Sequence, residues 1–127
     1  MSKKVEHVDA RTLHDWIAKG EAIVIDVREP HEYLRAHIPG SLQLPLSRLG
    51  AQELPAAEGR KVVVSCASGM RSLMAADRVL AAHYGTVYNL HGGLSGWQSA
   101  GFEVARDEQA AAQGLFPNLF AMFRNAG

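Results

Sequence analysis

The chain has 127 residues, enough for one domain, and its 47% hydrophobic and 20% charged residues are ordinary for a soluble globular protein. Thirteen Lys and Arg residues balance thirteen Asp and Glu residues, so net charge gives no reason to expect a nucleic acid or an anionic membrane as a partner. The single cysteine excludes an internal disulfide, and the chain has neither a signal peptide nor a predicted transmembrane segment, so we expect a cytoplasmic protein.

Helices and strands alternate through the first half of the chain. Asp9 can cap a helix that ends at Gly20 and carries its apolar side chains on one face. Residues 22–27, AIVIDV, are typical of a buried strand because they are almost continuously apolar. Three elements are expected next: a short helix from Pro30 to Ala36, a short strand over 41–44, and a small helix with a loop over 45–59.

The second half continues the alternation. Residues 61–65, KVVVS, and residues 86–90, TVYNL, are predicted strands. The segment between them is predicted to be a helix that ends at Gly85, and a short helix is expected around Trp97. This order predicts an α/β protein with a parallel sheet covered by helices on both faces.

The carboxyl ends of the predicted strands bring together three chemically capable side chains. Sites in such sheets gather at that edge, and Asp26, Cys66 and His91 all fall at or near it. Cys66 enters a turn of small residues before a helix, so successive backbone N–H groups can form an anion-binding concavity. With the permanent charge of Arg71, this arrangement favours a reactive thiolate and predicts a depressed pKa for Cys66.

Three separated segments resemble the signatures of the rhodanese family, the thiosulfate sulfurtransferases. They are CASGMRS at 66–72, DVREPHEY at 26–33 with AHIPGS at 36–41, and LHGGLSGW at 90–97. The resemblance assigns residues 1–106 to a rhodanese-like domain. It implies an α/β fold with a central parallel five-stranded sheet and helices on both faces.

The resemblance also implies a double displacement. The Cys66 thiolate would take the outer sulfur of thiosulfate, release sulfite, and pass the sulfur from a persulfide to cyanide, a thiol or a protein acceptor. Arg71 would hold the anionic donor. The remaining loop residues would bind the sulfur: Ala67, Ser68, Gly69, Met70 and Ser72. We expect no metal and no cofactor, because the six histidines are scattered and there is only one thiol.

Other functions use the same residues. Rhodanese-like phosphatases have one more residue between Cys and Arg, whereas four residues separate Cys66 from Arg71 here, which favours sulfur transfer. A cysteine hydrolase would need His91 as its base. A sulfur-relay module, which delivers sulfur only to a partner protein, would need the same loop as the enzyme.

Two further positions leave alternatives open. Several thiosulfate-specific members have a second Arg directly after the Cys, where this chain has Ala67, so the donor is either thiosulfate or another persulfide. Asp26 either supports the active loop, with Arg28 as its partner, or only caps the turn into the helix at Pro30.

The C-terminal segment 107–127 lies beyond the resemblance. It is apolar and holds three of the four Phe residues. Pro117 can open a short helix there, and we expect this segment to pack on the domain or to form a homodimer contact.

Overall fold

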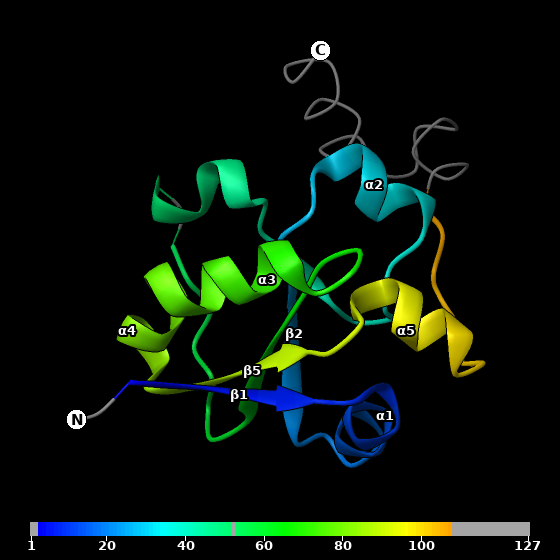
Figure 1. The fold of residues 1–127 in the computed structure, drawn as a ribbon, viewed down its shortest axis with the longest axis horizontal. Helices are drawn as coiled ribbons and strands as arrows, with labels where there is room; N and C mark the ends of the chain where they lie inside the picture. The colour runs from blue at the N-terminus through cyan, green and yellow to red at the C-terminus, as the bar shows by residue number, and fades with distance from the viewer. Residues whose placement is uncertain (1–2, 52, 108–127) are drawn as a thin grey trace.

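The computed structural model describes residues 3–51 and 53–107, which form a central sheet with helices around it (Figure 1). All the strand pairs are parallel, in the order β1-β5-β4-β2-β3. The strands are β1 (Lys4–Val8), β2 (Ala22–Asp26), β3 (Leu42–Gln43), β4 (Lys61–Ser65) and β5 (Thr86–Leu90). The predicted α/β class with a parallel five-stranded sheet is therefore confirmed.

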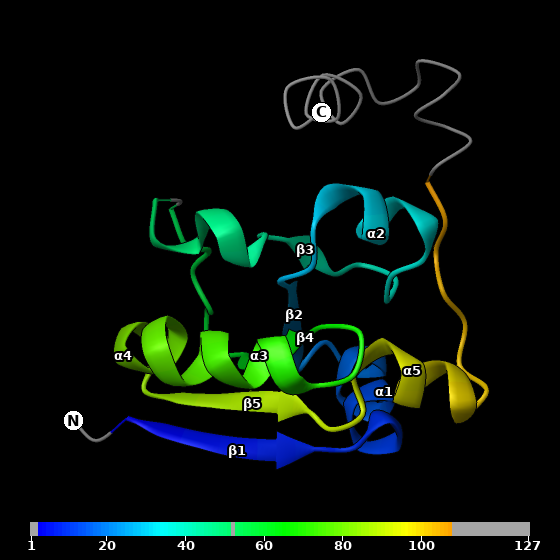
Figure 2. The ribbon, with the colours of Figure 1, turned by 45° about the horizontal axis from the view of Figure 1, so that its top comes forward.

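Seven helical segments lie between or after the described strands. They are α1 (Ala10–Ala18), α2 (Pro30–Arg35), the 3-10 helix η1 (Leu46–Ala51), α3 (Met70–Ala75), the π-helical turn η2 (Ala76–Leu80), α4 (Ala81–Tyr84) and α5 (Gly93–Ser99). The segments α3, η2 and α4 follow one another without a break, so they form the single predicted helix, and it ends at Gly85 with φ +85°. Figure 2 shows this helix running along β5.

Two hydrophobic cores form because neighbouring residues of a buried strand point to opposite faces. Val62 and Val64 of β4 pack in the core that includes Ala76 and Leu80 of η2. Val63, between them, packs in the other core. That second core includes Leu13 of α1 and Trp97 of α5. Helices therefore cover both faces of the sheet, and the near-continuous apolar runs of the strands follow from this.

Strand β1 is the element that the sequence pattern did not predict. It lies at one edge of the sheet, paired only with β5, and its burial pattern is mostly exposed or intermediate. Its polar residues Lys4 and Glu6 form an ion pair of 3.0 Å. An edge strand with charged side chains lacks the apolar run that marks a buried strand, so its position is fixed by pairing rather than by its own composition.

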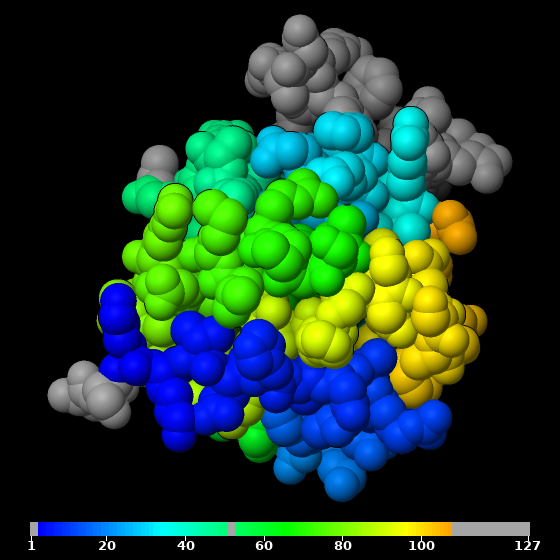
Figure 3. Space-filling view, viewed as in Figure 1, coloured from blue at the N-terminus to red at the C-terminus, as the bar shows by residue number. Residues whose placement is uncertain are grey.

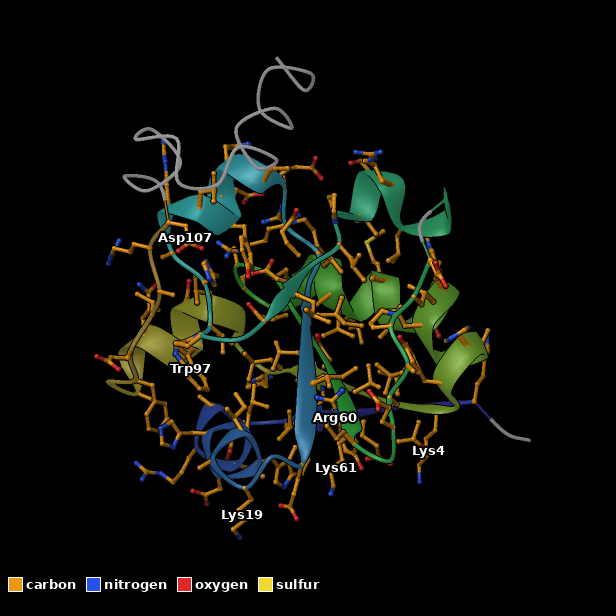
Figure 4. All side chains as sticks on the ribbon, turned by 180° about the vertical axis from the view of Figure 1, so that it is seen from behind. Lys4, Lys19, Arg60, Lys61, Trp97 and Asp107 are labelled. Atoms are coloured by element: carbon orange, nitrogen blue, oxygen red, sulfur yellow. The ribbon has the colours of Figure 1, made fainter. Side chains whose placement is uncertain are left out.

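The end of the described chain is attached to α2. The Asp107 N–H donates to the Leu34 carbonyl over 3.0 Å, and the Asp107 carboxylate lies 3.4 Å from Nε2 of His37 (Figure 4). The helix and the dimer contact predicted within 107–127 lie outside the described residues, apart from Asp107. No described helix combines the length and the apolar character that crossing a membrane requires.

Candidate active site

The loop that carries Cys66 leaves β4 at the carboxyl edge of the sheet, as predicted. It lies between α2 and α5 in both ribbon views (Figures 1 and 2). In the space-filling view, the green surface of the loop and α3 borders the cyan surface of α2 and the yellow surface of α5 (Figure 3). Met70 is 69% exposed and Ser68 is also exposed, whereas Cys66 itself is only 1% exposed.

The sulfur of Cys66 accepts hydrogen bonds from its own loop. The Gly69 N–H lies 3.1 Å from Sγ, and the Ser72 hydroxyl lies 3.4 Å from it. Burial alone raises the pKa of the thiol, but hydrogen bonds from the Ser72 hydroxyl and from the backbone N–H groups of Ser72, Gly69 and Ser68 outweigh burial and lower that pKa. The direction of the predicted shift is confirmed, and its source is mainly the loop's hydrogen-bond donors.

Helix α5 fixes the loop from the other side. The Leu94 N–H donates to the Cys66 carbonyl over 2.8 Å, and the Ser95 N–H donates to the Ala67 carbonyl over 3.0 Å. Unpaired N–H groups at the start of the helix thus bind the loop's carbonyls. A Cβ atom on Gly93 would lie 2.5 Å from the Cys66 carbonyl oxygen, and Gly93 has φ +58°, so only glycine allows this approach.

Asn89 contributes to the site, although sequence analysis gave it no role. Its Nδ2 donates to the Gly69 carbonyl over 3.2 Å, and its Oδ1 accepts from the Ser72 hydroxyl. That hydroxyl has one proton and two acceptors, Asn89 Oδ1 and Cys66 Sγ. It can donate to Asn89 while the thiol is protonated and turn to the sulfur when the thiol ionises. A buried amide near the end of an apolar strand was the available signal.

Arg71 and Glu32 form the rim pair, which joins α3 to α2. Arg71 Nη1 and Nη2 each lie 2.9 Å from a Glu32 carboxylate oxygen, and the two side chains are 38% and 26% exposed. Chiefly because of the hydrogen bonds from Arg71, and against the opposing effect of burial, the pKa of Glu32 is lowered to about 2. Glu32 lies within the DVREPHEY motif, which assigns it no role, and the sequence predicts that Arg71 binds the donor without a carboxylate partner.

Asp26 and Arg28 form the buried pair. It lies near the rim pair, because Arg28 Nη1 also donates to the Glu32 carbonyl over 3.4 Å. Arg28 Nη2 lies 2.8 Å from the Asp26 carboxylate and 2.6 Å from the Ala36 carbonyl, and the two residues are 2% and 5% exposed. The Arg28 N–H also donates to Asp26 over 2.9 Å. Glu29, rather than Asp26, is the N-cap residue of α2, while Asp26 both accepts the Arg28 N–H in the turn before that helix and pairs with the Arg28 side chain.

Among the described residues, His91 makes no hydrogen bond to the Cys66 sulfur. It is exposed, and its ring centroid lies 6.4 Å from that of His7. The hydrogen bonds to the Cys66 sulfur come from the Gly69 N–H and the Ser72 hydroxyl instead. The described residues also hold no group of three or more His, Cys, Asp or Glu side chains that could bind a metal ion.

Comparisons with known proteins agree with this geometry. The rhodanese-like domain family matches residues 9–100. An uncharacterised protein of Synechocystis is 37% identical over 100 residues, which cover 79% of this chain but only 56% of that protein. A protein of Allochromatium vinosum named sulfurtransferase is 32% identical over 105 residues, 82% of this chain and 98% of that one.

Comparison with solved structures also indicates a rhodanese-like fold. The crystal structure of a rhodanese-related protein from Thermoplasma volcanium superposes with a TM-score of 0.70 at 29% identity, covering 79% of this chain and 97% of that one. Because the family matches well over half of the residues and includes the Cys66 loop, the chain belongs to the rhodanese-like domain family.

Proposed function

We propose that the protein is a sulfurtransferase in which Cys66 carries the sulfur as a persulfide. In the first step, the thiolate attacks the outer sulfur of the donor, the donor's S–S bond breaks, and the leaving group departs with the electron pair. In the second step, cyanide or a thiol attacks the outer sulfur of the persulfide and regenerates the thiolate. The donor is thiosulfate or another persulfide.

The hydrogen-bond donors around Cys66 Sγ carry this proposal. A nucleophilic thiolate and a persulfide anion both need donors at the sulfur, and Gly69 and Ser72 supply them at 3.1 and 3.4 Å. The loop needs no separate base, because its own donors already lower the pKa of Cys66. A cysteine hydrolase, in contrast, would need a base that is hydrogen-bonded to the sulfur, and His91 makes no such hydrogen bond in the described part of the chain.

Arg71 is the candidate donor-binding side chain. Its guanidinium has five N–H donors, and Glu32 takes one from each of Nη1 and Nη2. Three N–H groups therefore stay available for a bound anion. The loop residues Ala67, Ser68 and Met70, which are partly or largely exposed, provide the opening through which an acceptor would approach.

A sulfur-relay module is the second candidate function. Met70 and Met74 are 69% and 43% exposed, and they lie one helical turn apart on α3, next to the loop. Exposed large apolar side chains beside a reactive group favour a protein partner. In this function the outer sulfur of the Cys66 persulfide passes to a thiol of an acceptor protein, and small acceptors are turned over slowly. The cytoplasmic location stays a prediction.

Steady-state kinetics test the proposal. With thiosulfate or an alkyl persulfide as donor and cyanide or a small thiol as acceptor, we expect parallel double-reciprocal lines, as a covalent intermediate requires. Cys66→Ser should abolish turnover, while Ser99→Ala on the exposed end of α5 should leave it unchanged. Turnover that survives Cys66→Ser, or turnover of an aryl phosphate through Cys66, would contradict the proposal.

A further inference from the structure

We propose that Glu32 is a specificity-determining residue, which disfavours dianionic donors such as thiosulfate and favours persulfides of the form R–S–SH. The inference rests on the proposed function and assigns a donor class to the same site. It follows from the charge that the rim pair presents to a donor that approaches Cys66.

The two ion pairs next to the loop add no net positive charge. Arg71 is matched by Glu32 at 2.9 Å, and Arg28 is matched by Asp26 at 2.8 Å. Ala67 adds no charge. With the Cys66 thiolate included, these groups carry a net charge of −1. A dianion that approaches such a site meets repulsion that one unmasked Arg71 would offset.

Four other cations, Lys4, Lys19, Arg60 and Lys61, lie away from the loop (Figure 4). Lys61 begins β4 beside Ala22 at the start of β2, and Lys4 begins β1 beside Thr86 at the start of β5. Together with Lys19 and Arg60 they lie at the end of the sheet opposite α2 (Figure 4). The catalytic loop leaves the carboxyl ends of the strands, so these side chains lie at the wrong edge to attract its donor.

A backbone hydrogen bond also holds the Glu32 carboxylate of the rim pair, in addition to its ion pair with Arg71. Glu32 Oε2 accepts from Arg71 Nη1 and also from the Glu29 N–H, each at 2.9 Å. Oε1 accepts from Arg71 Nη2 at 2.9 Å. Because the first turn of α2 fixes this carboxylate, Arg71 can give its full charge to a donor only by leaving Glu32. The pKa of about 2 keeps Glu32 ionised wherever Cys66 is a thiolate.

The two donor classes make different demands on Arg71. Thiosulfate brings two negative charges, and sulfite leaves with two when the S–S bond breaks and the Cys66 persulfide anion forms. An alkyl hydropersulfide carries at most one negative charge and reacts as an electrophile in its neutral, protonated form. Its outer sulfur with its proton then joins Cys66, and R–S⁻ leaves with one negative charge. Because the Coulomb energy scales with the product of the two charges, masking part of the charge of Arg71 costs a dianionic donor and its dianionic leaving group more than it costs a donor whose leaving group carries one charge.

A charge-neutral variant of Glu32 tests the inference. Glu32→Gln keeps the shape and releases the full charge of Arg71. We expect the ratio of kcat/KM for thiosulfate to kcat/KM for an uncharged alkyl hydropersulfide to rise about tenfold, the size of one charge-assisted hydrogen bond. The rise should shrink as ionic strength increases.

Glu29→Gln is the matched control. It removes one carboxylate charge from the start of the same helix. The Glu29 side chain accepts from the Ser47 hydroxyl at 3.1 Å and from the Glu32 backbone N–H rather than from Arg71, and the amide oxygen of Gln can still accept both hydrogen bonds. Its donor ratio should stay near that of the wild type. A readout without turnover is the calorimetric affinity of Cys66→Ser protein for thiosulfate, which adding Glu32→Gln should raise by a similar factor.

Failure of this inference is distinct from failure of the proposed function. If the wild type takes sulfur from neither donor, the proposed function fails. If it transfers sulfur but Glu32→Gln leaves the donor ratio and the thiosulfate affinity unchanged, or lowers both, then Glu32 only orients Arg71 and the specificity inference is wrong.

Discussion

The buried pair, Asp26–Arg28, and the rim pair, Glu32–Arg71, use the same two functional groups for different purposes. In the buried pair, both side chains are almost fully enclosed, and Arg28 also binds the Ala36 carbonyl. In the rim pair, the side chains are 38% and 26% exposed, and Arg71 keeps three N–H groups without a contact to Glu32. Burial therefore separates a structural ion pair from one that a donor can reach.

This difference in burial predicts which substitutions should affect stability and which should affect donor specificity. Removing one partner of a buried pair leaves an uncompensated charge in the interior. An exposed pair adds little stability, because water screens its charges. The buried pair should therefore hold α2 against the sheet, while the rim pair should act mainly on the donor.

The largest expected effect comes from breaking the buried pair. Arg28→Met leaves the Asp26 carboxylate buried and the Ala36 carbonyl without this donor. We expect it to lower the free energy of unfolding by about 3–5 kcal/mol. Chemical denaturation of the full chain measures this loss.

Arg71→Met is the matched control, with the same change of side chain in the rim pair. It should lower the free energy of unfolding by less than about 1 kcal/mol. Equal losses from the two substitutions would show that burial does not separate the two pairs.

A smaller effect should come from the hydrogen bonds around the sulfur. Asn89→Ala removes the donor to the Gly69 carbonyl and one acceptor of the Ser72 hydroxyl, at a cost of about 1–3 kcal/mol in the free energy of unfolding. Ser72→Ala removes a donor to the sulfur itself and should raise the pKa of Cys66 more than Asn89→Ala does. Rates of Cys66 alkylation against pH measure both shifts.

The outcome for Ser72 also tests the origin of the pKa shift. If Ser72→Ala leaves the alkylation profile unchanged while Arg71→Met raises the pKa of Cys66, the cation rather than the loop's hydrogen bonds controls the thiolate. That result would contradict the account of the sulfur's environment.

The smallest expected effect is the pH dependence of the rim pair. The pKa of Glu32 is lowered from 4.5 to about 2 in the folded protein, so its contribution to stability is present above pH 4.5 and is lost as pH falls toward 2. After allowance for solvent screening, the free energy of unfolding of the wild type should exceed that of Glu32→Gln by no more than about 1 kcal/mol near pH 6, the same limit as for Arg71→Met. Denaturation at a series of pH values measures the difference, and a difference that does not change with pH would contradict the assignment.

The sequence predicted the sheet because its buried strands are almost continuously apolar. β2, β4 and β5 were found from their own composition. Strand β1 was missed because an edge strand pairs on one side only and carries charges such as Lys4 and Glu6. Its place follows from pairing with β5, which only the three-dimensional structure defines.

For the site, residues close in sequence were predictable and residues brought together by folding were not. The loop from Cys66 to Ser72 was identified from its local pattern, and the Asp26–Arg28 pair joins residues two apart. Glu32 reaches Arg71 across 39 positions, and Asn89 reaches Ser72 across 17. Such contacts depend on how α2 and β5 lie beside the loop.

The most direct test of the central claim is the intact mass of the protein after brief treatment with thiosulfate or an alkyl hydropersulfide. The account predicts that the wild type gains the mass of one sulfur atom, that cyanide removes it, and that Cys66→Ser gains nothing. Gain of sulfur by Cys66→Ser, or no gain by the wild type from either donor, would contradict the claim that Cys66 carries the sulfur.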